Sequence, residues 1–401
     1  MKIAFFVGRF PVLSETFVLN QITSLIERGH DVSIFAEQDG GEASTHPDVD
    51  RFGLRNRVRY ERMPDRAAAR ARQLPALWTS GQAARRTLNP IRYGRDAASL
   101  RLAWTARFLQ EAPSFDIIHC HFGALGLKAT RAREVGALRG RIVTAFHGED
   151  VTNYPKRFRP GLYSPLFEQG DLFLPISARW NDSLMAMGCP PERIRVHRMG
   201  VDLRRFVPRS SGSQQRVRIA TVGRLVEKKG IEDAIMALST VRTPFEYLVA
   251  GDGPLRNQLE ALARERLPAG AVHFLGAQTQ DAVIPLLQSA DIFLAPSVTG
   301  ADGDIEGIPV SIMEAMALAL PIVSTRHSGI PELVSHGVSG LLLEEHDIAG
   351  LSSALSDLAA DPALRARFGA AGRAIVASEY NVATLTDRLI DLYSEAIARQ
   401  S

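Results

Sequence analysis

The sequence predicts an α/β protein built from two doubly wound units, each a parallel β-sheet covered by helices. Short apolar runs rich in β-branched residues alternate with longer segments of helical periodicity, a pattern typical of parallel strands joined by crossover helices. The alternation stops at PRSSGSQQR, residues 208–216, whose composition is that of a flexible linker, and then starts again. We therefore expect a two-lobed protein with its ligand in the cleft, at the carboxyl ends of the strands.

The first unit is expected to form a domain over residues 1–205. Its first helix, Glu15–Arg28, has apolar residues at helical spacing and is followed by Gly29, as a helix C-terminus often is. The expected strands are Ile3–Val7, Val32–Phe35, Asp116–His119, Ile142–Phe146, Leu172–Leu174 and Ile194–Val196.

The second unit is expected to form a domain over residues 206–380. Residues 381–401 are expected to add a C-terminal helix that packs back toward the first domain, because helical periodicity extends from Val382 to Ala398. The expected strands are Val217–Val222, Tyr247–Ala250, Val272–Leu275, Ile292–Ala295, Ile322–Ser324 and Gly340–Leu343.

Composition excludes several classes of protein. The 401 residues are 45% hydrophobic and 23% charged, which is ordinary globular usage and excludes disorder and coiled coils. Cys120 and Cys189 offer neither a disulfide framework nor a paired zinc motif, so a reducing, cytoplasmic compartment is expected. The N-terminus is too short in apolar residues for a signal peptide, and no run approaches the roughly 20 apolar residues of a membrane-spanning helix. We expect a soluble or peripheral protein.

Charge is divided unevenly along the chain. Residues 1–205 carry 31 basic and 21 acidic side chains, a net +10, whereas residues 206–401 carry 16 and 23, a net −7. The excess lies in an arginine-rich segment, residues 51–107, where apolar and aromatic side chains alternate with arginines that include Arg62, Arg66, Arg70 and Arg72. This segment predicts contact with anionic lipid headgroups or phosphates, and a solvated helical surface is the alternative. No nucleic-acid partner is expected.

Two cations follow the first strand of the second unit. In TVGRLVEKKG, Arg224 and Lys229 lie in a strand-to-helix loop, and the next helix is expected to begin near Gly230. A helix N-terminus attracts anions, while Arg supplies a planar fork and Lys a point charge. The loop therefore suits a diphosphate, and two exposed surface cations are the alternative.

Two glutamates flank a helix start after strand Ile292–Ala295. Glu306 lies in the loop and Glu314 in the first turns of the helix that Pro309 and Ser311 begin. A carboxylate accepts two hydrogen bonds, which matches a vicinal diol of a ribose or hexose, and Gly307 allows close approach of the backbone. Ser311 and Glu314 also have the spacing of a capping box, which would leave Glu314 a purely structural role.

Histidines gather at strand ends in the first unit. One strand ends in HCHFG and the next in HGED, which brings His119, His121 and His147 together. A metal site on His119, Cys120 and His121 is disfavoured, because adjacent strand residues point to opposite faces. We expect His147 to hydrogen-bond a sugar hydroxyl or to stabilise developing charge, and His119 and His121 to be structural.

Other phosphate and metal motifs are weak. In GRFPVLSET, Gly8 is expected to form a tight turn after the first strand, but no complete GxGxxG follows a strand, so a nicotinamide enzyme is poorly supported. The tripeptides Asp48-Val-Asp50 and Asp302-Gly-Asp304 keep a magnesium or manganese site only as a minor alternative.

The order of motifs HGED, GRLVEKKG, GDGP, ADIFLAPS and EGIPVSIMEAMALALPIVST resembles retaining glycosyltransferase family 4. The N-terminal FPVLSETFVLNQI is similar to exopolysaccharide enzymes of the colanic-acid or amylovoran type. The resemblance implies the GT-B fold, two Rossmann-like doubly wound domains facing across a cleft, and a reaction without metal or other cofactor. The departure is Gly8-Arg9-Phe10-Pro11, where many members have paired glycines.

The resemblance also implies residue roles. Arg224 and Lys229 would hold the donor diphosphate, Glu314 the nucleotide ribose, and His147 would lie beside the sugar. Glu306 and the following backbone would hold the donor sugar, and the nucleobase would pack near β-strand residues 274–276. The implied catalytic residues are His147, Arg224, Lys229 and Glu306, and the implied donor-binding residues are Gly8, Arg224, Lys229, Phe274, Leu275, Glu306, Gly307, Ile308, Pro309, Val310 and Glu314.

The resulting expectation is a retaining, metal-independent hexosyltransferase. It would use a UDP- or GDP-sugar and a growing, lipid-linked oligosaccharide on the cytoplasmic face of a bacterial membrane, with the acceptor bound by the first domain. The alternatives are a transferase for a soluble acceptor, a nucleotide-sugar epimerase of the same fold, and a non-catalytic binder of sugar nucleotides. The binder is disfavoured because it would have little need of Arg224, Lys229, Glu306 and Glu314 together.

Overall fold

The computed structural model describes residues 1–12, 15–41, 46–73, 85–158, 160–208 and 216–399, and it divides into two compact units. Unit 1 consists of Met1–Ile176, Trp180–His197 and the C-terminal segment from Thr386, and unit 2 of Ser177–Arg179 and Arg198–Leu385. The expected boundary was residue 205, and most of the expected linker, residues 209–215, lies outside the described residues.

Unit 1 contains a parallel six-stranded sheet in the order β3-β2-β1-β4-β5-β6. Its strands are β1 (Lys2–Phe10), β2 (Asp31–Asp39), β3 (Val58–Tyr60), β4 (Ile117–His121), β5 (Arg141–Phe146) and β6 (Leu172–Pro175). Five of the expected strands are confirmed. The expected strand Ile194–Val196 is wrong, because only an isolated bridge joins Ile194 to Phe173, and β3 lies in the arginine-rich segment where no strand was expected.

The tight turn expected at Gly8 is also wrong. Strand β1 continues through Gly8 to Phe10 because its partner β2 extends to Asp39, and Arg9 pairs with Gln38 and Phe10 with Asp39. Gly8 is thus a strand residue, and the chain does not turn after Val7.

The alternation of side chains along β1 divides the core of unit 1 between the two faces of its sheet. Ile3, Phe5 and Val7 join one buried cluster, whereas Ala4 and Phe6 join another, as a period of two requires. The first cluster also contains Leu389 and Tyr393 of α20 (Val382–Ala398), so the C-terminal segment contributes to the core of unit 1.

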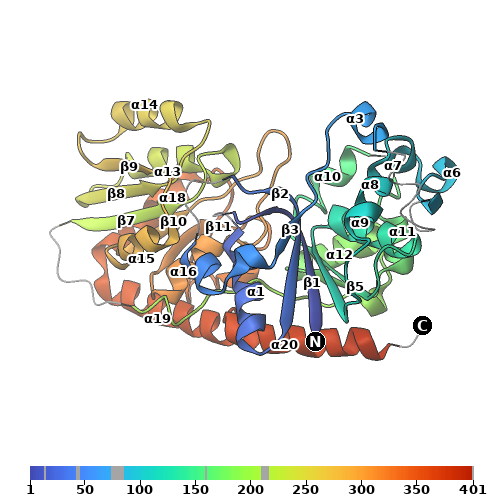
Figure 1. The fold of residues 1–401 in the computed structure, drawn as a ribbon. Coiled ribbons are helices and arrows are strands. Elements are labelled where there is room, and N and C mark those ends of the chain that lie inside the picture. Colours follow the sequence, from blue (N-terminus) through green and yellow to red (C-terminus); the bar gives the residue numbers. More distant parts are fainter. Residues whose placement is uncertain (13–14, 42–45, 74–84, 159, 209–215, 400–401) are drawn as a thin grey trace. The chain divides into compact units, whose positions relative to one another are not determined.

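Helices cover both faces of this sheet (Figure 1). The first, α1, has the expected position, and Gly29 just beyond it has the left-handed conformation (φ 80°) of a helix C-terminus. The α-helices are α1 (Thr16–Glu27), α2 (Pro47–Arg51), α3 (Ala67–Ala71), α6 (Pro90–Tyr93), α7 (Arg95–Ala98), α8 (Arg101–Phe108), α9 (Gly123–Glu134), α10 (Asn153–Lys156), α11 (Ser164–Gln169) and α12 (Ala178–Ala186), with 3₁₀ turns at Leu54–Asn56 and Pro191–Arg193.

Unit 2 contains a second parallel six-stranded sheet, in the order β12-β11-β10-β7-β8-β9. All six expected strands are confirmed, with ends that differ by two residues or fewer. The strands are β7 (Val217–Val222), β8 (Phe245–Ala250), β9 (Val272–Gly276), β10 (Ile292–Ala295), β11 (Ile322–Thr325) and β12 (Gly340–Leu343).

Buried apolar clusters lie on both faces of the second sheet, under helices contributed by the segments between strands. The helices are a 3₁₀ turn (Glu227–Lys229), α13 (Ile231–Leu238), α14 (Arg256–Arg266), α15 (Gln280–Gln288), α16 (Val310–Ala317), α17 (Ile330–Leu333), α18 (Ile348–Ala360) and α19 (Pro362–Glu379). Within the described part of the chain, no helix has both the length and the apolar character needed to span a bilayer.

Each sheet reverses its strand order at one point, between β1 and β4 in unit 1 and between β7 and β10 in unit 2. At such a point the crossovers leave in opposite directions, so the loops at the carboxyl ends of the two strands leave an open crevice where α/β proteins bind ligands. The loops after β7 and β10 are the ones in which the sequence placed Arg224, Lys229 and Glu306.

Candidate functional site

The loop after β7 is packed directly against the loop after β10. Gly230, which precedes α13 in a left-handed conformation (φ 62°), lies so close to β10 that an added Cβ would be 1.8 Å from the carbonyl oxygen of Pro296. The amide of Val298 donates to the Lys228 carbonyl (3.0 Å), and the amide of Ala301 to Glu227 Oε2 (3.0 Å). The two loops therefore form one connected structure.

Lysine and carboxylate side chains join these loops. Lys229 Nζ lies 3.1 Å from Glu306 Oε1, and Lys228 Nζ lies 2.9 Å from Asp304 Oδ2 and 4.0 Å from Glu306. Burial alone would raise the pKa of the Glu306 carboxyl, but the ammonium groups of Lys229 and Lys228 outweigh it and hold the pKa below its ordinary value. Glu306 is thus a buried carboxylate beside a cation.

Arg224 lies on the same loop with an exposed side chain, three residues before the 3₁₀ turn that contains Lys229. Helix α13 begins at Ile231, one residue later than expected, with Gly230 before it and no side chain capping its first amides. The structure therefore places both cations in the loop before a helix N-terminus.

Residues 307–310 contribute backbone to the end of the second loop. The Ile308 side chain is buried in the apolar core, and Pro309 directly precedes α16 with an extended backbone. A ligand at this loop would meet main-chain atoms of these residues, together with the Glu306 carboxylate.

Two residues that the sequence analysis missed hold this loop in place. The amide of Glu306 donates to His327 Nε2 (3.0 Å), and His327 Nδ1 lies 2.6 Å from Glu345 Oε1. Glu345 also accepts from the amide of Thr299 (2.7 Å) at the other end of the loop. The available signal was position, because His327 follows the carboxyl end of β11 and Glu345 that of β12.

Glu314 lies in α16 and is almost fully buried. Its Oε1 accepts from Gln280 Nε2 (2.8 Å), and Gln280 Oε1 accepts from Arg205 (2.6 Å). Burial raises the pKa of the carboxyl to about 7, against the opposing effects of Gln280 and Arg205. The capping box is excluded, because Pro309 precedes the helix and no side chain caps it.

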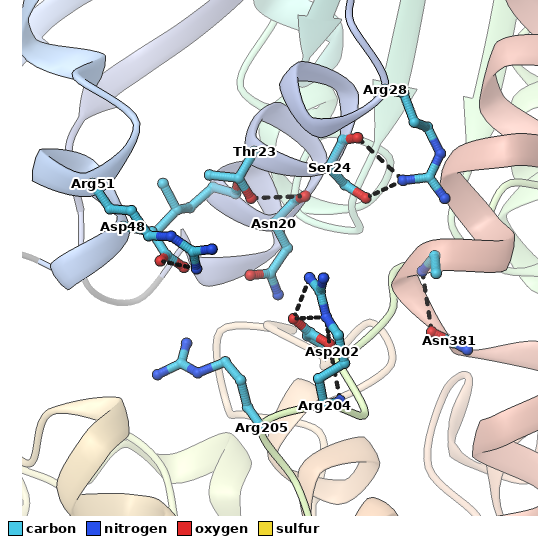
Figure 2. A network of polar contacts seen from close by, with 12 residues as sticks. Asn20, Thr23, Ser24, Arg28, Asp48, Arg51, Asp202, Arg204, Arg205 and Asn381 are labelled. Atoms are coloured by element: carbon cyan, nitrogen blue, oxygen red, sulfur yellow. Dashed lines mark hydrogen bonds and ion pairs between the residues drawn. The ribbon is translucent and has the colours of Figure 1, made fainter.

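Arg205 and Gln280 were also missed, since no spacing connects them to Glu314. Arg205 leaves a loop in which Arg204 turns back onto Asp202 (Nη2–Oδ2 2.8 Å), and Figure 2 shows the Arg205 side chain pointing away from that pair. Arg205 also pairs with Asp281 (2.6 Å). It therefore anchors the first turn of α15 and, through Gln280, the Glu314 carboxyl.

The expected nucleobase residues lie on the edge strand β9. Phe274 packs partly against the apolar core, whereas Leu275 is 39% exposed. The strand curls at Gly276 (φ 72°), which accepts from the Gly251 amide (2.8 Å) in the GDGP loop. Leu275 is therefore the side chain of this pair that a planar ligand would contact.

In unit 1, the predicted histidines meet at the ends of β4 and β5. His121 Nδ1 lies 3.0 Å from His147 Nε2, and His119 Nδ1 lies 2.8 Å from the Tyr393 hydroxyl. Burial lowers the pKa of His147 and of His119 to about 3, so both rings are neutral. A neutral His147 can donate or accept a hydrogen bond.

Asp150 of the HGED motif organises the backbone around His147. Its carboxylate accepts from the amides of Gly123 (3.0 Å), His147 (2.9 Å) and Gly148 (2.9 Å). Burial raises the pKa of this carboxyl to about 6, although the three amides oppose the shift. Asp150 was not singled out by the sequence analysis, yet it connects the loop after β5 to the start of α9.

Alternation along β4 separates the residues of the disfavoured metal site. Cys120 joins the apolar cluster on one face, while His119 and His121 stack with Phe5, which belongs to the opposite face. Among the described residues no group of three or more His, Cys, Asp or Glu side chains is placed to hold a metal ion.

Comparisons with known proteins show the family to which this chain belongs. The sequence model of Glycosyltransferase Family 4 matches residues 14–205, and that of Glycosyl transferases group 1 matches residues 204–375. The chain is 41% identical over 369 residues to the putative colanic acid biosynthesis glycosyltransferase WcaL of Salmonella typhimurium, covering 89% of this chain and 90% of that protein. The chain belongs to glycosyltransferase family 4.

Further likenesses agree with this membership. The glycosyltransferase is 39% identical to the amylovoran biosynthesis glycosyltransferase AmsK of Erwinia amylovora, over 95% of this chain and 96% of that protein. Its structure is similar to that of Anabaena Alr3699/HepE, crystallised with UDP and glucose, at a TM-score of 0.73 and 16% identity, covering 98% and 100% of the two chains. The expected GT-B class of α/β fold is confirmed.

Proposed function

We propose that this glycosyltransferase transfers a hexose from a UDP- or GDP-sugar to an oligosaccharide acceptor in exopolysaccharide biosynthesis. The observation that carries the proposal is the Lys229–Glu306 pair at the point where the unit 2 sheet reverses its strand order. A nucleotide sugar joins an anionic diphosphate to a polyhydroxylated ring through one C–O bond. An ammonium and a carboxylate 3.1 Å apart match these two groups.

The relatives support the pathway in this proposal. The names of WcaL and AmsK refer to the biosynthesis of colanic acid and amylovoran, and both proteins match this glycosyltransferase along about nine-tenths of their length or more. HepE was crystallised with UDP and glucose, which supports a nucleotide-sugar donor for a protein of the same fold.

The proposed reaction retains the configuration of the sugar. The acceptor hydroxyl forms a bond to the anomeric carbon while the bond from that carbon to the β-phosphate oxygen breaks, and the bonding pair leaves with the phosphate. The hydroxyl proton passes to the departing phosphate oxygen on the same face. Lys229 and Arg224 stabilise the charge that develops on the diphosphate, which removes the need for a bound metal ion.

The remaining predicted residues are assigned to donor binding. Glu314 binds the ribose hydroxyls, Leu275 contacts the base with Phe274 packed beside it against the core, and Glu306 with the backbone of residues 307–310 binds the hexose. His147 acts as a neutral hydrogen-bonding partner of a sugar hydroxyl, because burial holds its pKa at about 3. This is one of the two roles that the sequence predicts for His147.

The acceptor is proposed to be lipid-linked, at the cytoplasmic surface of a bacterial membrane. Within the arginine-rich segment, an exposed group is formed by Ile91, which is 97% exposed, and by the neighbouring Arg85, Arg86, Arg92 and Arg95. We call this group the arginine surface. An apolar tip among cations suits the boundary between anionic headgroups and acyl chains.

Not every arginine of the segment is available to a membrane. Arg70, which the sequence analysis counted among the contacting cations, is buried and donates to the carbonyls of Ser99 (2.7 Å), Asp65 (3.1 Å) and Pro64. That role for Arg70 is wrong, because its guanidinium already satisfies backbone carbonyls. Residues 74–84, with Leu74, Leu77 and Trp78, lie outside the described residues.

Calorimetric titration tests the donor site. UDP, GDP, ADP and their common sugar conjugates are titrated in EDTA into the wild type, Lys229→Ala and the control Arg264→Ala, which removes an equal charge from the exposed face of α14. We expect one nucleotide class to bind, and Lys229→Ala to weaken it by about 10- to 100-fold, as loss of a charge-assisted hydrogen bond predicts. Arg264→Ala should bind as the wild type does.

Three results would contradict parts of the proposal. If no nucleotide binds the wild type, the donor specificity proposed here is wrong. Binding that appears only when Mg²⁺ replaces EDTA would contradict metal independence. Inversion at the anomeric carbon of the product, measured by NMR coupling constants, would contradict retention.

A further inference from the structure

His327 makes two hydrogen bonds that leave its ring no free polar atom. The backbone amide of Glu306 can only donate, so His327 Nε2, 3.0 Å away, is the acceptor and carries no proton. The proton is then on Nδ1, which donates to Glu345 Oε1 at 2.6 Å. With 1% of its side chain exposed, His327 cannot touch a donor or acceptor itself.

Glu345 joins both ends of the loop that follows β10. It accepts from the amide of Thr299 (2.7 Å) near the start of the loop, and through His327 it acts on Glu306 near the end. Burial alone would raise the pKa of Glu345, but the hydrogen bonds from His327 and Thr299 lower it below the ordinary value. Glu345 therefore remains a carboxylate and fixes the proton on Nδ1 of His327.

The main chain that leads into His327 is held by the sheet. Ser324 Oγ, at the end of β11, donates to the Ala295 carbonyl of β10 (2.6 Å), and Thr325 Oγ1 donates to the Ser297 carbonyl. The carbonyl of His327 accepts from the Ile330 amide (3.0 Å). The main chain at His327 is thus held by hydrogen bonds to the sheet and to the next turn, and this fixes the position of the ring atom Nε2.

We infer that His327 is a positioning residue for the donor sugar. Its Nε2 accepts from the amide of Glu306. This hydrogen bond fixes the position from which the Glu306 carboxylate contacts Lys229 and the sugar hydroxyls. The inference rests on the proposed function, since it assigns the hexose to Glu306. Because Arg224 and Lys229 lie on the other loop, loss of the Nε2 acceptor should weaken binding of the sugar, which Glu306 contacts directly, more than binding of the nucleotide, which Glu306 affects only through its ion pair with Lys229 (3.1 Å).

Two substitutions of His327 distinguish the role of Nε2 from that of Nδ1. In His327→Gln the amide oxygen can occupy the place of Nε2 and accept from Glu306, whereas in His327→Asn the shorter amide can serve only in the place of Nδ1. His336→Asn controls for the substitution itself. His336 accepts a backbone hydrogen bond at Nδ1 (from Leu342, 3.0 Å), which asparagine can keep, and it lies on an exposed turn before the edge strand β12.

The measurement is the calorimetric affinity of UDP and GDP compared with UDP-glucose and GDP-mannose for each protein. We expect His327→Asn to bind the preferred nucleoside diphosphate within about twofold of the wild type and its sugar conjugate about tenfold more weakly, and His327→Gln to recover most of that loss. The ratio of the two affinities in His336→Asn should match the wild type. A purely structural role would lower the unfolding temperature without changing this ratio.

Each result decides between the alternatives. If His327→Asn is folded and retains the wild-type ratio, or if His327→Gln loses as much as His327→Asn, the inference is overturned. If the wild type binds no nucleotide, the proposed function fails instead. Should His327→Asn not fold, Glu345→Ala replaces it, because Glu345 is 30% exposed and its loss frees the ring. A sugar-specific loss in this variant supports the inference, and an unchanged ratio overturns it.

Discussion

Glu306 and Glu314 show how two residues of the same type acquire opposite properties from their surroundings. Lys229 and Lys228 lower the pKa of Glu306, whereas burial beside the neutral amide of Gln280 raises the pKa of Glu314 to about 7. A carboxylate beside a cation is ready to accept hydrogen bonds at neutral pH. Glu314 is only partly ionised there, so the two glutamates respond differently to pH.

Glu314 is expected to make stability fall as pH rises. Its folded pKa of about 7 exceeds the ordinary 4.5, so the folded protein binds the proton more tightly, and the stabilisation that is complete below pH 4.5 is lost as pH rises through 7. The shift corresponds to roughly 3 kcal/mol at about 1.4 kcal/mol per pH unit. As pH is raised from 5 to 8, the midpoint temperature of thermal unfolding should therefore fall more in the wild type than in Glu314→Gln.

The same ionisation should appear in donor binding. If the Glu314 carboxylate accepts from the ribose hydroxyls, nucleotide affinity measured by calorimetry should increase as pH rises through about 7, since ionisation leaves Oε2 unprotonated as an acceptor while Oε1 accepts from Gln280. In Glu314→Gln this increase should be absent. A wild-type affinity that is constant from pH 6 to 8 would contradict the role of Glu314 at the ribose.

At the scale of elements, the strand-to-helix junction at Gly230 determines how closely the loops after β7 and β10 approach each other. The left-handed backbone (φ 62°) turns the chain from the 3₁₀ turn into α13, and Pro296 leaves no room for a side chain. The motif GRLVEKKG contains this glycine, but its sequence alone does not reveal that the neighbouring element is the end of β10.

Gly230→Ala should be more destabilising than a left-handed conformation alone explains. Gly270 provides the comparison, because it has a similar φ of 76° but open space around its Cβ position. We expect Gly270→Ala to cost about 1–2 kcal/mol, and Gly230→Ala about 1–3 kcal/mol more because the Pro296 carbonyl must move. Urea denaturation compares them, and equal losses would show that the loop after β10 yields without cost.

Strand positions were more predictable than strand ends. Apolar runs identified all six strands of unit 2. A fully buried parallel strand such as β10 reads as a continuous hydrophobic segment, whereas the edge strand β9 is only partly buried. The end of β1 was misplaced, since its last residues are held by pairing with β2 rather than by their own hydrophobicity. Strand β3, at the edge of its sheet, consists of Val58–Tyr60 with an arginine at its centre, and it gave no apolar signal.

At the scale of the whole molecule, the excess of basic residues in the first half of the sequence lies in unit 1. The described arginines of the arginine-rich segment divide into internal and exposed groups. Arg70 satisfies carbonyls and Arg59 lies over the Phe35 and Phe108 rings (5.7 and 5.6 Å), whereas the arginine surface and also Arg62, Arg66 and Arg72 are exposed. Only the exposed arginines are available to an anionic partner, and among them Arg92 is already paired with Glu134 (2.7 Å).

The arginine surface is expected to bind anionic vesicles. We predict that the wild type sediments with vesicles of phosphatidylglycerol and phosphatidylcholine at low salt and dissociates as salt is raised. Replacing Arg85, Arg86 and Arg95 by serine should weaken binding by more than about tenfold, at roughly 1 kcal/mol for each cation near the surface. The control replaces three exposed arginines of unit 2, Arg264, Arg266 and Arg326. Equal binding by both triple variants would contradict the proposed membrane contact.

The sequence by itself determined the α/β class, the two doubly wound sheets, most strands, and the candidate residues Arg224, Lys229, Glu306 and Glu314. It could do so because hydrophobic periodicity and strand-end motifs are local properties of the chain. The family resemblance assigned those residues their roles, which the titrations above test.

Only the tertiary structure decided which groups meet and in what ionisation state. The pairing of Lys229 with Glu306, the support of Glu306 by His327 and Glu345, and the link from Arg205 through Gln280 to Glu314 join residues that are distant in sequence. The physical reason is that strand order brings loops together and burial sets the local solvation. Hydrogen-bond partners and pKa values depend on both, and neither is visible in residue spacing.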